Sequence, residues 1–341
     1  MRFIESVEEL ERRLAAPSER DVDSIRRIGG DIIILGAGGK MGPSLARRIK
    51  HAALESGTTL RLFAVSRFSS ADVANRLQAG GIETIACDLL NRSEVEKLPL
   101  CPHVLYLSGR KFGSAEHPYL TWAANTVIPV HVASRFRASR IVAFSTGNVY
   151  APVKPDCGGS VESWELDPSG EYAQSCLGRE RVFEFYSSEY GTPCLLFRLN
   201  YAVDLRYGVL VDIARRVLAG QPVDLTVPVF NVIWQGDANS YALRCLELCA
   251  SPPRAMNITG PEIVSVRWAA EYFGREFQRE PLFCGESCGR ALLSNAALCH
   301  SILGYPEVSL GTLMQWVAHW VSGGGETLDK PTKFEVADGK F

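Results

Sequence analysis

Residues 31–42 read Asp-Ile-Ile-Ile-Leu-Gly-Ala-Gly-Gly-Lys-Met-Gly, a run of β-branched residues followed directly by a cluster of glycines. Residues 31–35 are typical of a short buried strand, and residues 41–51 are typical of a helix. A glycine turn between a strand and a helix lets the backbone approach a phosphate at the positive end of the helix. The glycines fit both the GxG and the GxxGxxG spacing, which predicts a dinucleotide-binding loop. A tight turn without a cofactor is the alternative. The predicted cofactor contacts of the loop are Gly36, Gly38, Gly39, Lys40, Met41 and Gly42.

The pattern of this first unit repeats along the first two hundred residues. Further strand-like segments alternate with helical stretches. The predicted strands are residues 60–65, 83–87, 103–107, 140–144 and 193–198. The predicted helices are residues 70–79, 119–136 and 172–190. Short strands that alternate with helices indicate a parallel sheet with helices on both faces. We therefore predict an α/β fold with a Rossmann-type doubly wound parallel sheet, whose ligands lie beyond the carboxyl ends of the strands.

The pattern loosens after Asn200, and this change suggests a division of the chain. We expect residues 1–28 to form an N-terminal helical extension, a short surface helix. The dinucleotide-binding domain would comprise residues 29–200 and about 230–256. A smaller C-terminal α/β substrate-binding domain would comprise residues 201–229 and 257–325, and residues 326–341 would form an irregular tail.

Composition excludes several classes of function. A net charge of −2 gives no electrostatic reason to expect binding to nucleic acid or to an anionic membrane. No apolar run approaches the about 20 residues that span a bilayer, and the N-terminus lacks the apolar core of a secretion signal. The ten cysteines are scattered without a CxxC pair, so we expect reduced thiols in a cytoplasmic protein and no metal site.

The end of the second predicted strand, Val65-Ser66-Arg67-Phe68, bears on the choice of cofactor. An acidic residue at this point usually holds the ribose 2′-hydroxyl of NAD. Ser66 and Arg67 instead offer a hydroxyl and a guanidinium that suit a 2′-phosphate. The sequence therefore favours NADP over NAD, although Arg67 as a solvated surface residue is the alternative.

Several further motifs resemble those of one family. They are Cys87-Asp88-Leu89, Leu107-Ser108-Gly109, Ala124-Asn125, the stretch from Phe144 to Tyr150 and the stretch from Tyr172 to Cys176. With the glycine loop, they make roughly residues 31–321 resemble the extended short-chain dehydrogenase/reductase superfamily, in its group of NAD(P)-dependent sugar epimerases and dehydratases. The resemblance implies further cofactor contacts from Asp88, Leu89, Ser108, Gly109, Asn125 and Cys176.

The resemblance also implies catalytic roles. The tyrosine of the family's YxxxK motif exchanges a proton with the substrate oxygen while a serine or threonine hydrogen-bonds that oxygen, and these roles fall on Tyr172 and Thr146. A free tyrosine has a pKa near ~10, and the lysine one helical turn later normally lowers it. This chain has Cys176 at the lysine position. Either another cation replaces the lysine, or Tyr172 is not activated.

Two cations are candidates for the replacement. Lys111, in the loop after the fourth predicted strand, ranks first, although a solvated loop lysine is an equal alternative. Arg179 is on the helical face of Tyr172 but two turns away, so it ranks second. Cys176 as a nucleophile is disfavoured, because the sequence places no histidine near it to act as a base.

The family's dehydratases carry an Asp-Glu pair after the catalytic threonine, where this chain has Gly147 and Asn148. We therefore expect epimerisation or net oxidation and reduction of a sugar or nucleotide sugar, and no dehydration. Candidate substrate contacts are Asn148, Asn200, Arg206 and Trp234; for Arg206 a surface position, and for Trp234 a core position, are the alternatives.

Three functions stay open at this point. The first is an active NAD(P)-dependent epimerase or dehydrogenase/reductase. The second is a catalytically silent NADP(H)-binding sensor or regulatory protein, which the lost lysine favours. The third, a structural interaction module, is disfavoured by the glycine loop. The family often pairs through the helices equivalent to residues 119–136 and 172–190, which predicts a homodimer.

Overall fold

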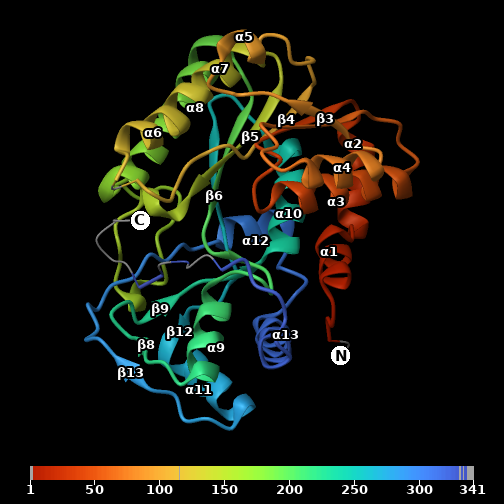
Figure 1. The fold of residues 1–341 in the computed structure, drawn as a ribbon. Coiled ribbons are helices and arrows are strands. Elements are labelled where there is room, and N and C mark those ends of the chain that lie inside the picture. The colour runs from red at the N-terminus through yellow and green to blue at the C-terminus, as the bar shows by residue number, and fades with distance from the viewer. Residues whose placement is uncertain (1–2, 115, 330–331, 333, 336–341) are drawn as a thin grey trace.

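A sheet of seven parallel strands forms the centre of the larger lobe in the computed structural model, which describes residues 3–114, 116–329, 332 and 334–335. The strand order is β11-β6-β5-β4-β1-β2-β3 (Figure 1). The strands are β1 Ile32–Leu35, β2 Leu62–Ser66, β3 Glu83–Ala86, β4 His103–Tyr106, β5 Arg140–Thr146, β6 Cys194–Leu199 and β11 Arg254–Ile258. The predicted doubly wound α/β fold is confirmed.

Strand β1 lies between β4 and β2. The strands β2 and β3 extend the sheet on one side of β1, and β4, β5, β6 and β11 extend it on the other side. All four of its residues are buried, because helices cover both faces of the sheet. Its neighbours β2 and β4 are paired with it in parallel register, with Leu35 opposite Val65 and Tyr106. The order of the strands reverses at this point, and a crevice opens beyond their carboxyl ends.

Alternate residues of each strand pack on different helices. Ile32 and Ile34 join the core formed with α2 Glu19–Ile28, α3 Gly42–Ser56, α4 Ala71–Ala79 and α10 Gln235–Arg244. Ile33 and Leu35 join the core on the other face, with α7 Ile128–Arg135 and α8 Gly170–Tyr190. The short helix α5 Arg92–Val95 adds Val95 to this second core.

The helix predicted over residues 119–136 is divided in the structure. It consists of α6 Pro118–Trp122, the π-helical turn η1 Ala123–Val127 and α7. Asn125 lies in the π turn and is fully buried. Such turns often occur at functional sites, because the extra residue redirects a side chain.

The N-terminal extension differs from the single surface helix that the sequence suggested. It forms two helices, α1 Val7–Ala15 and α2, and the inner face of α2 is buried. Asp21 of α2 has no exposed area, and its carboxylate pairs with Arg48 of α3 at 2.6 Å. A charge buried in this way must be paired, so the extension is an integral part of the fold.

A second lobe with its own apolar core lies below the sheet in Figure 1. It is built from α9 Val209–Ala219, α11 Val266–Phe277 and α13 Leu310–Ser322, with α12 Ala297–Leu303 near the larger lobe. Six short strands pair in three two-stranded sheets: β7 Ala202–Val203 with β10 Ile233–Trp234, β9 Val229–Phe230 with β12 Val264–Ser265, and β8 Val223–Asp224 with β13 Phe283–Cys284.

Three short 3-10 helices complete the described elements: η2 Gly147–Val149, η3 Pro155–Cys157 and η4 Cys245–Leu248. The predicted irregular tail has neither helix nor strand in its described residues, and its residues 330–331, 333 and 336–341 lie outside them. Among the described residues, no helix is long and apolar enough to cross a bilayer, and no group of three metal-binding side chains occurs.

Candidate active site

Two adjoining cavities lie at the carboxyl ends of the strands around β1. The outer cavity, of about 500 Å³, is lined by residues that include Ser66, Arg67, Asp88, Leu89, Ser108 and Gly109. The inner cavity, of about 340 Å³, is lined by residues that include Lys40, Lys111, Thr146, Asn148, Tyr172 and Asn200. Gly36, Gly39 and Leu107 line both, so the two cavities meet over the glycine loop.

The glycine loop has two kinds of glycine. An added Cβ would stand 2.7 Å from the Ser108 amide nitrogen at Gly36, which has a φ of +92°, and 2.3 Å from the Ala37 carbonyl oxygen at Gly42. These two glycines are required by the fold of the loop itself. At Gly39 the nearest atom would be 3.4 Å away, so this backbone is open toward the cavities. An open backbone before the N-terminus of α3 fits a pyrophosphate.

The predicted cofactor contacts divide between the cavities. Gly38 lines the outer cavity, whereas Lys40, Met41 and Gly42 line the inner one. Arg67 is exposed at the rim of the outer cavity, where β2 ends without an acidic side chain. Asp88 also lines the outer cavity, and its carboxylate accepts a hydrogen bond from the Leu90 amide at 3.1 Å.

Asn125 and Cys176 line neither cavity and lie behind the loop that follows β4. The Asn125 side chain accepts a hydrogen bond from the Arg110 amide at 2.9 Å and donates to the Arg110 carbonyl at 3.0 Å. Cys176 is fully buried, with its sulfur 4.0 Å from Asn125 Nδ2. The prediction that these side chains touch the cofactor therefore needs correction: Asn125 positions the loop at Arg110, and Cys176 is packed in the interior.

Tyr172 and Thr146 meet in the inner cavity. Thr146 ends β5, Tyr172 lies in the first turn of α8, and both line the inner cavity, where the Thr146 hydroxyl lowers the pKa of Tyr172. The Thr146 hydroxyl donates to Asn148 Oδ1 at 2.9 Å. Burial raises the pKa of Tyr172 and the neighbouring Cys176 raises it further, whereas the Arg179 charge lowers it. The phenol is thus well placed, but its acidity depends on nearby cations.

Both candidate cations lie near Tyr172. Lys111 lines the inner cavity, and its Nζ is 5.8 Å from the centroid of the Tyr172 ring. Arg179 is buried in α8, where it donates to the Phe144 carbonyl at 2.8 Å and to Asn125 Oδ1 at 2.5 Å. Arg179 is therefore held in place by its hydrogen bonds to the fold. Of these two candidates, Lys111 is the one that lines the cavity.

The four predicted substrate contacts fall into two pairs. Asn148 and Asn200 line the inner cavity, with Asn200 donating to the Leu292 carbonyl at 3.2 Å. Trp234 does not reach it, because its ring is 2% exposed and packs 5.5 Å from Trp316 in the core of the second lobe. The prediction for Trp234 is corrected accordingly.

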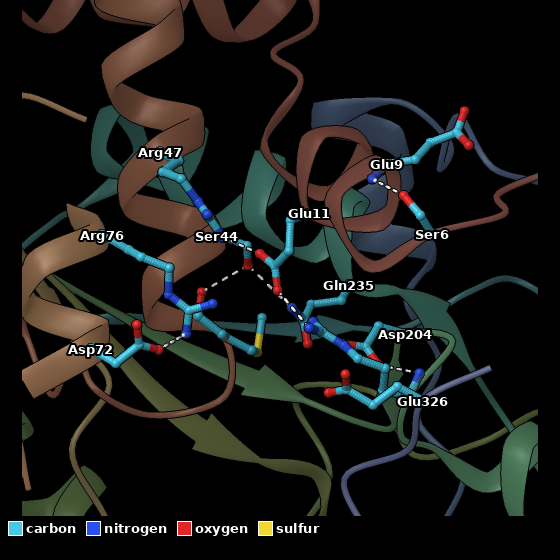
Figure 2. Close-up of polar contacts among 12 residues, drawn as sticks. Ser6, Glu9, Glu11, Ser44, Arg47, Asp72, Arg76, Asp204, Gln235 and Glu326 are labelled. Atoms are coloured by element: carbon cyan, nitrogen blue, oxygen red, sulfur yellow. Dashed lines mark hydrogen bonds and ion pairs between the residues drawn. The ribbon is translucent and has the colours of Figure 1, made fainter. Parts of the chain in front are cut away.

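Arg206 also lies away from the lining of the inner cavity. Its guanidinium is paired with Glu11 of α1 at 2.7 Å and with Asp204 at 3.2 Å. Figure 2 shows these two acids near each other. These acids neutralise its charge, so the prediction of a substrate contact is corrected to a contact between the N-terminal helix and the second lobe.

Tyr207 and Thr332 are among the lining residues that the sequence did not predict. Tyr207 lies in the loop before α9, and Thr332 lies in the C-terminal tail. The Thr332 hydroxyl donates to Asp212 Oδ2 at 2.6 Å, which holds this part of the tail against α9. Tyr207 precedes the positive-φ Gly208, which was a visible turn signal, whereas nothing in the local sequence marks Thr332.

A glycine loop at the switch point of a parallel sheet, with a cavity on each side, defines a dinucleotide-binding Rossmann protein. Residues 32–229 match the model of the NAD dependent epimerase/dehydratase family. The chain belongs to this family. A comparison with curated protein sequences gave no match.

Solved structures with the same fold include several enzymes of nucleotide-sugar metabolism. UDP-glucose 4-epimerase of Thermotoga maritima with UDP-glucose has 17% identity and a TM-score of 0.69, covering 86% of this chain and 99% of that one. The Thermus thermophilus UDP-glucose 4-epimerase complex with NAD has 18% identity and a TM-score of 0.69, with coverages of 86% and 99%. A double mutant of dTDP-glucose 4,6-dehydratase from Streptomyces venezuelae with NAD bound has 16% identity and a TM-score of 0.72, with coverages of 85% and 96%. At these low sequence identities, the structural similarity shows that this chain has the same fold as these enzymes.

Proposed function

We propose that the protein binds a nicotinamide dinucleotide and transfers a hydride to or from a sugar or nucleotide sugar. The observation that carries the proposal is the junction of two cavities over the glycine loop, with Thr146 and Tyr172 both lining the inner one. Residues 29–200 and about 230–256 would bind the cofactor, and residues 201–229 and 257–325 would supply substrate contacts.

The proposed cofactor is NADP(H). NAD(H) is the alternative, because similar solved structures contain bound NAD. The backbone at Gly36 and Gly39 would hold the pyrophosphate at the N-terminus of α3. Ser66 and Arg67 would hold the 2′-phosphate, since no carboxylate replaces them at the end of β2. The bound cofactor would supply hydride acceptance and donation.

The chain's own residues would handle the proton. As a phenolate, Tyr172 would take the proton of the substrate hydroxyl while the carbon that bears this hydroxyl loses hydride to the cofactor, and as a phenol it would return the proton in the reverse direction. Thr146 would hydrogen-bond the same substrate oxygen. Asn148 Oδ1 accepts a hydrogen bond from the Thr146 hydroxyl at 2.9 Å and so orients that side chain.

Cys176 occupies the position of the family's YxxxK lysine, and we propose that Lys111 supplies the missing charge. Its ammonium borders the same cavity as Tyr172 and stands 5.8 Å from the centre of the tyrosine ring. An adjacent cation favours the phenolate and lowers the pKa of the tyrosine. Arg179, two turns further along α8, adds to this effect. Gly147 and Asn148 offer no carboxylate base, so the proposed reaction is epimerisation or net oxidoreduction.

One observation favours a second function. Burial raises the pKa of Tyr172, and the cysteine beside it adds to the rise. A protein that binds NADP(H) without turnover, as a sensor or regulator, would tolerate such a phenol.

Turnover separates the two functions. Purified protein with NADP(H) or NAD(H) is offered a panel of sugars and nucleotide sugars, and nicotinamide absorbance and product stereochemistry are followed. The proposal predicts hydride transfer with at least one substrate, and a loss of about 10²–10⁴-fold in Tyr172→Phe. Dinucleotide binding without any hydride transfer across the panel would instead support the sensor.

A further inference from the structure

The lining of the inner cavity carries an excess of positive charge. Among the described residues, its lining contains two lysines, Lys40 and Lys111, and no carboxylate. Lys111 has a proposed role beside Tyr172, whereas the chemistry proposed above gives no role to Lys40.

Lys40 lies in the glycine loop, with its side chain directed to the inner cavity and the second lobe. Its Nζ donates to the Ala202 carbonyl at 3.1 Å and stands 4.0 Å from the centroid of the Tyr207 ring. These contacts fix the ammonium at the wall formed by the second lobe. Lys40 does not line the outer cavity, although it also lines a small cavity of about 70 Å³ with Glu11 and Arg206. Its contacts with Ala202 and Tyr207, which both line the inner cavity, place the ammonium on the substrate side of the loop.

The nearby acids are already paired. Asp204, the acid that acts most strongly on Lys40, is fully buried and pairs with Arg206 at 3.2 Å. Arg206 also pairs with Glu11, which in turn pairs with Arg47 of α3 (Figure 2). Asp212, the other acid that acts on Lys40, accepts hydrogen bonds from the Thr332 amide and hydroxyl. Lys40 therefore adds a positive charge to a region whose carboxylates already have partners.

Burial lowers the pKa of Lys40 to about 8, while Asp204 raises it and Arg206 lowers it further. The ammonium is thus mostly charged at pH 7, at a cost in solvation that an anionic ligand would offset.

We propose that Lys40 makes the inner cavity selective for a substrate that carries an anionic group, a carboxylate or a phosphate, on its sugar. This inference rests on the proposed function and narrows its substrate class. An ammonium held at one wall of a cavity without carboxylates forms a charge-assisted hydrogen bond with such a group. A neutral sugar offers the ammonium no charged partner.

The test compares matched ligands by calorimetry on protein saturated with dinucleotide. One pair, UDP-glucuronate and UDP-glucose, differs by a carboxylate. The other, glucose 6-phosphate and glucose, differs by a phosphate. At pH 7 we expect the charged member of at least one pair to bind the wild type tenfold or more tightly, and the pair that discriminates identifies the anion. Lys40→Met is expected to reduce the difference to threefold or less, and Lys40→Arg to retain it.

Lys97→Met is the matched control, because Lys97 is exposed in the turn after α5 and lines neither cavity. It should keep the wild-type preference. Equal binding of both members in the wild type, absence of binding by all four ligands, or an unchanged preference in Lys40→Met would overturn the inference. So would a Lys40→Met variant that weakens dinucleotide binding as strongly as ligand binding, since Lys40 would then serve the cofactor.

The preference should also depend on pH in the wild type. It should be present at pH 7 and decline as the pH rises through about 8, where Lys40 loses its proton. The charged groups around Lys40 are Asp204, Arg206, Asp212, Glu11, Arg47 and Arg76. A preference that is constant from pH 7 to pH 9.5 would contradict the role of Lys40. Hydride transfer is measured separately. A preference for the charged ligand without hydride transfer would contradict the proposed reaction but not this inference. Hydride transfer without a preference for the charged ligand would contradict this inference but not the proposed reaction.

Discussion

At the scale of single residues, the site is a tyrosine whose surroundings oppose its ionisation. Burial and Cys176 raise the pKa of Tyr172, and Arg179 lowers it. A catalytic phenol works best with a pKa near the working pH, so the cation at the cavity wall decides whether this one is active. The same scale explains the glycine loop, where Gly36 and Gly42 maintain the backbone and Gly39 leaves room for a ligand.

Lys111→Met should lower turnover at pH 7 about tenfold and move the rising limb of the pH–rate profile up by about one unit, since one pKa unit corresponds to one factor of ten. The direction follows because the loss of a positive charge raises the pKa of the phenol. Lys111→Arg should retain most of the rate. An unchanged profile in Lys111→Met would assign the activation to another group, with Arg179 the next to test.

Gly39→Ala should keep the thermal stability of the wild type but weaken dinucleotide binding tenfold or more, because the added methyl group fits the loop and occupies the open backbone. Gly42→Ala should lower the melting temperature instead, because its Cβ would stand 2.3 Å from the Ala37 carbonyl. Differential scanning fluorimetry and calorimetry compare the two. Wild-type affinity in Gly39→Ala would argue against a pyrophosphate at this loop.

At the scale of helices and strands, N-terminal helix α2 is fixed by a buried ion pair. The Asp21 carboxylate accepts from Arg48 at 2.6 Å and from the Ser240 hydroxyl at 2.6 Å, so it joins α2 to α3 and α10. Residues 1–31 precede the segment that matches the family model, yet their contacts reach the sheet's covering helices.

Asp21→Ala should lower the free energy of unfolding by about 3–5 kcal/mol, because it leaves Arg48 buried without a partner. Asp23→Ala is the control on the same helix. Asp23 pairs with Arg26 where both side chains are more than half exposed, so its loss should change stability by less than about 1 kcal/mol. Urea denaturation measures both, and a similar small effect for the two would mean that α2 is only loosely attached.

Elements with a clear local sequence pattern could be predicted. Features whose conformation is set by residues distant in the sequence could not. The β-branched run at 32–35 and the glycines after it gave the first strand, the loop and the cofactor side of the site. The π turn at Asn125 was not visible, because it is set by contacts with Arg110 and Arg179 rather than by its own sequence. For Trp234 the sequence left a substrate contact and a core position open, and the structure has the core position, because its partner Trp316 lies far along the chain.

At the scale of the whole molecule, we propose a homodimer. Large apolar side chains remain exposed on the helices that cover one face of the sheet: Tyr119 of α6 is 67% exposed, and Phe185 and Tyr190 of α8 are 53% and 49% exposed. Helices α6, α7 and α8 lie together on one side of the molecule (Figure 1). An apolar face of this kind marks a binding surface.

Phe185→Glu combined with Tyr119→Glu should shift the protein from dimer to monomer, because two carboxylates would lose their hydration in the interface. Tyr305→Glu is the control, since Tyr305 is 69% exposed but lies between α12 and α13. Light scattering coupled to size-exclusion chromatography gives the mass directly. A wild-type monomer at micromolar concentration would contradict the proposed dimer.

The central claim is that the junction of the two cavities holds a nicotinamide dinucleotide. The most direct measurement is calorimetric titration of the purified protein, freed of bound nucleotide, with NADP(H) and with NAD(H). The account predicts saturable binding of one dinucleotide per chain, tighter for NADP(H), and a loss of that preference in Arg67→Ala. If neither dinucleotide binds, the site cannot perform hydride transfer and the proposed function is wrong.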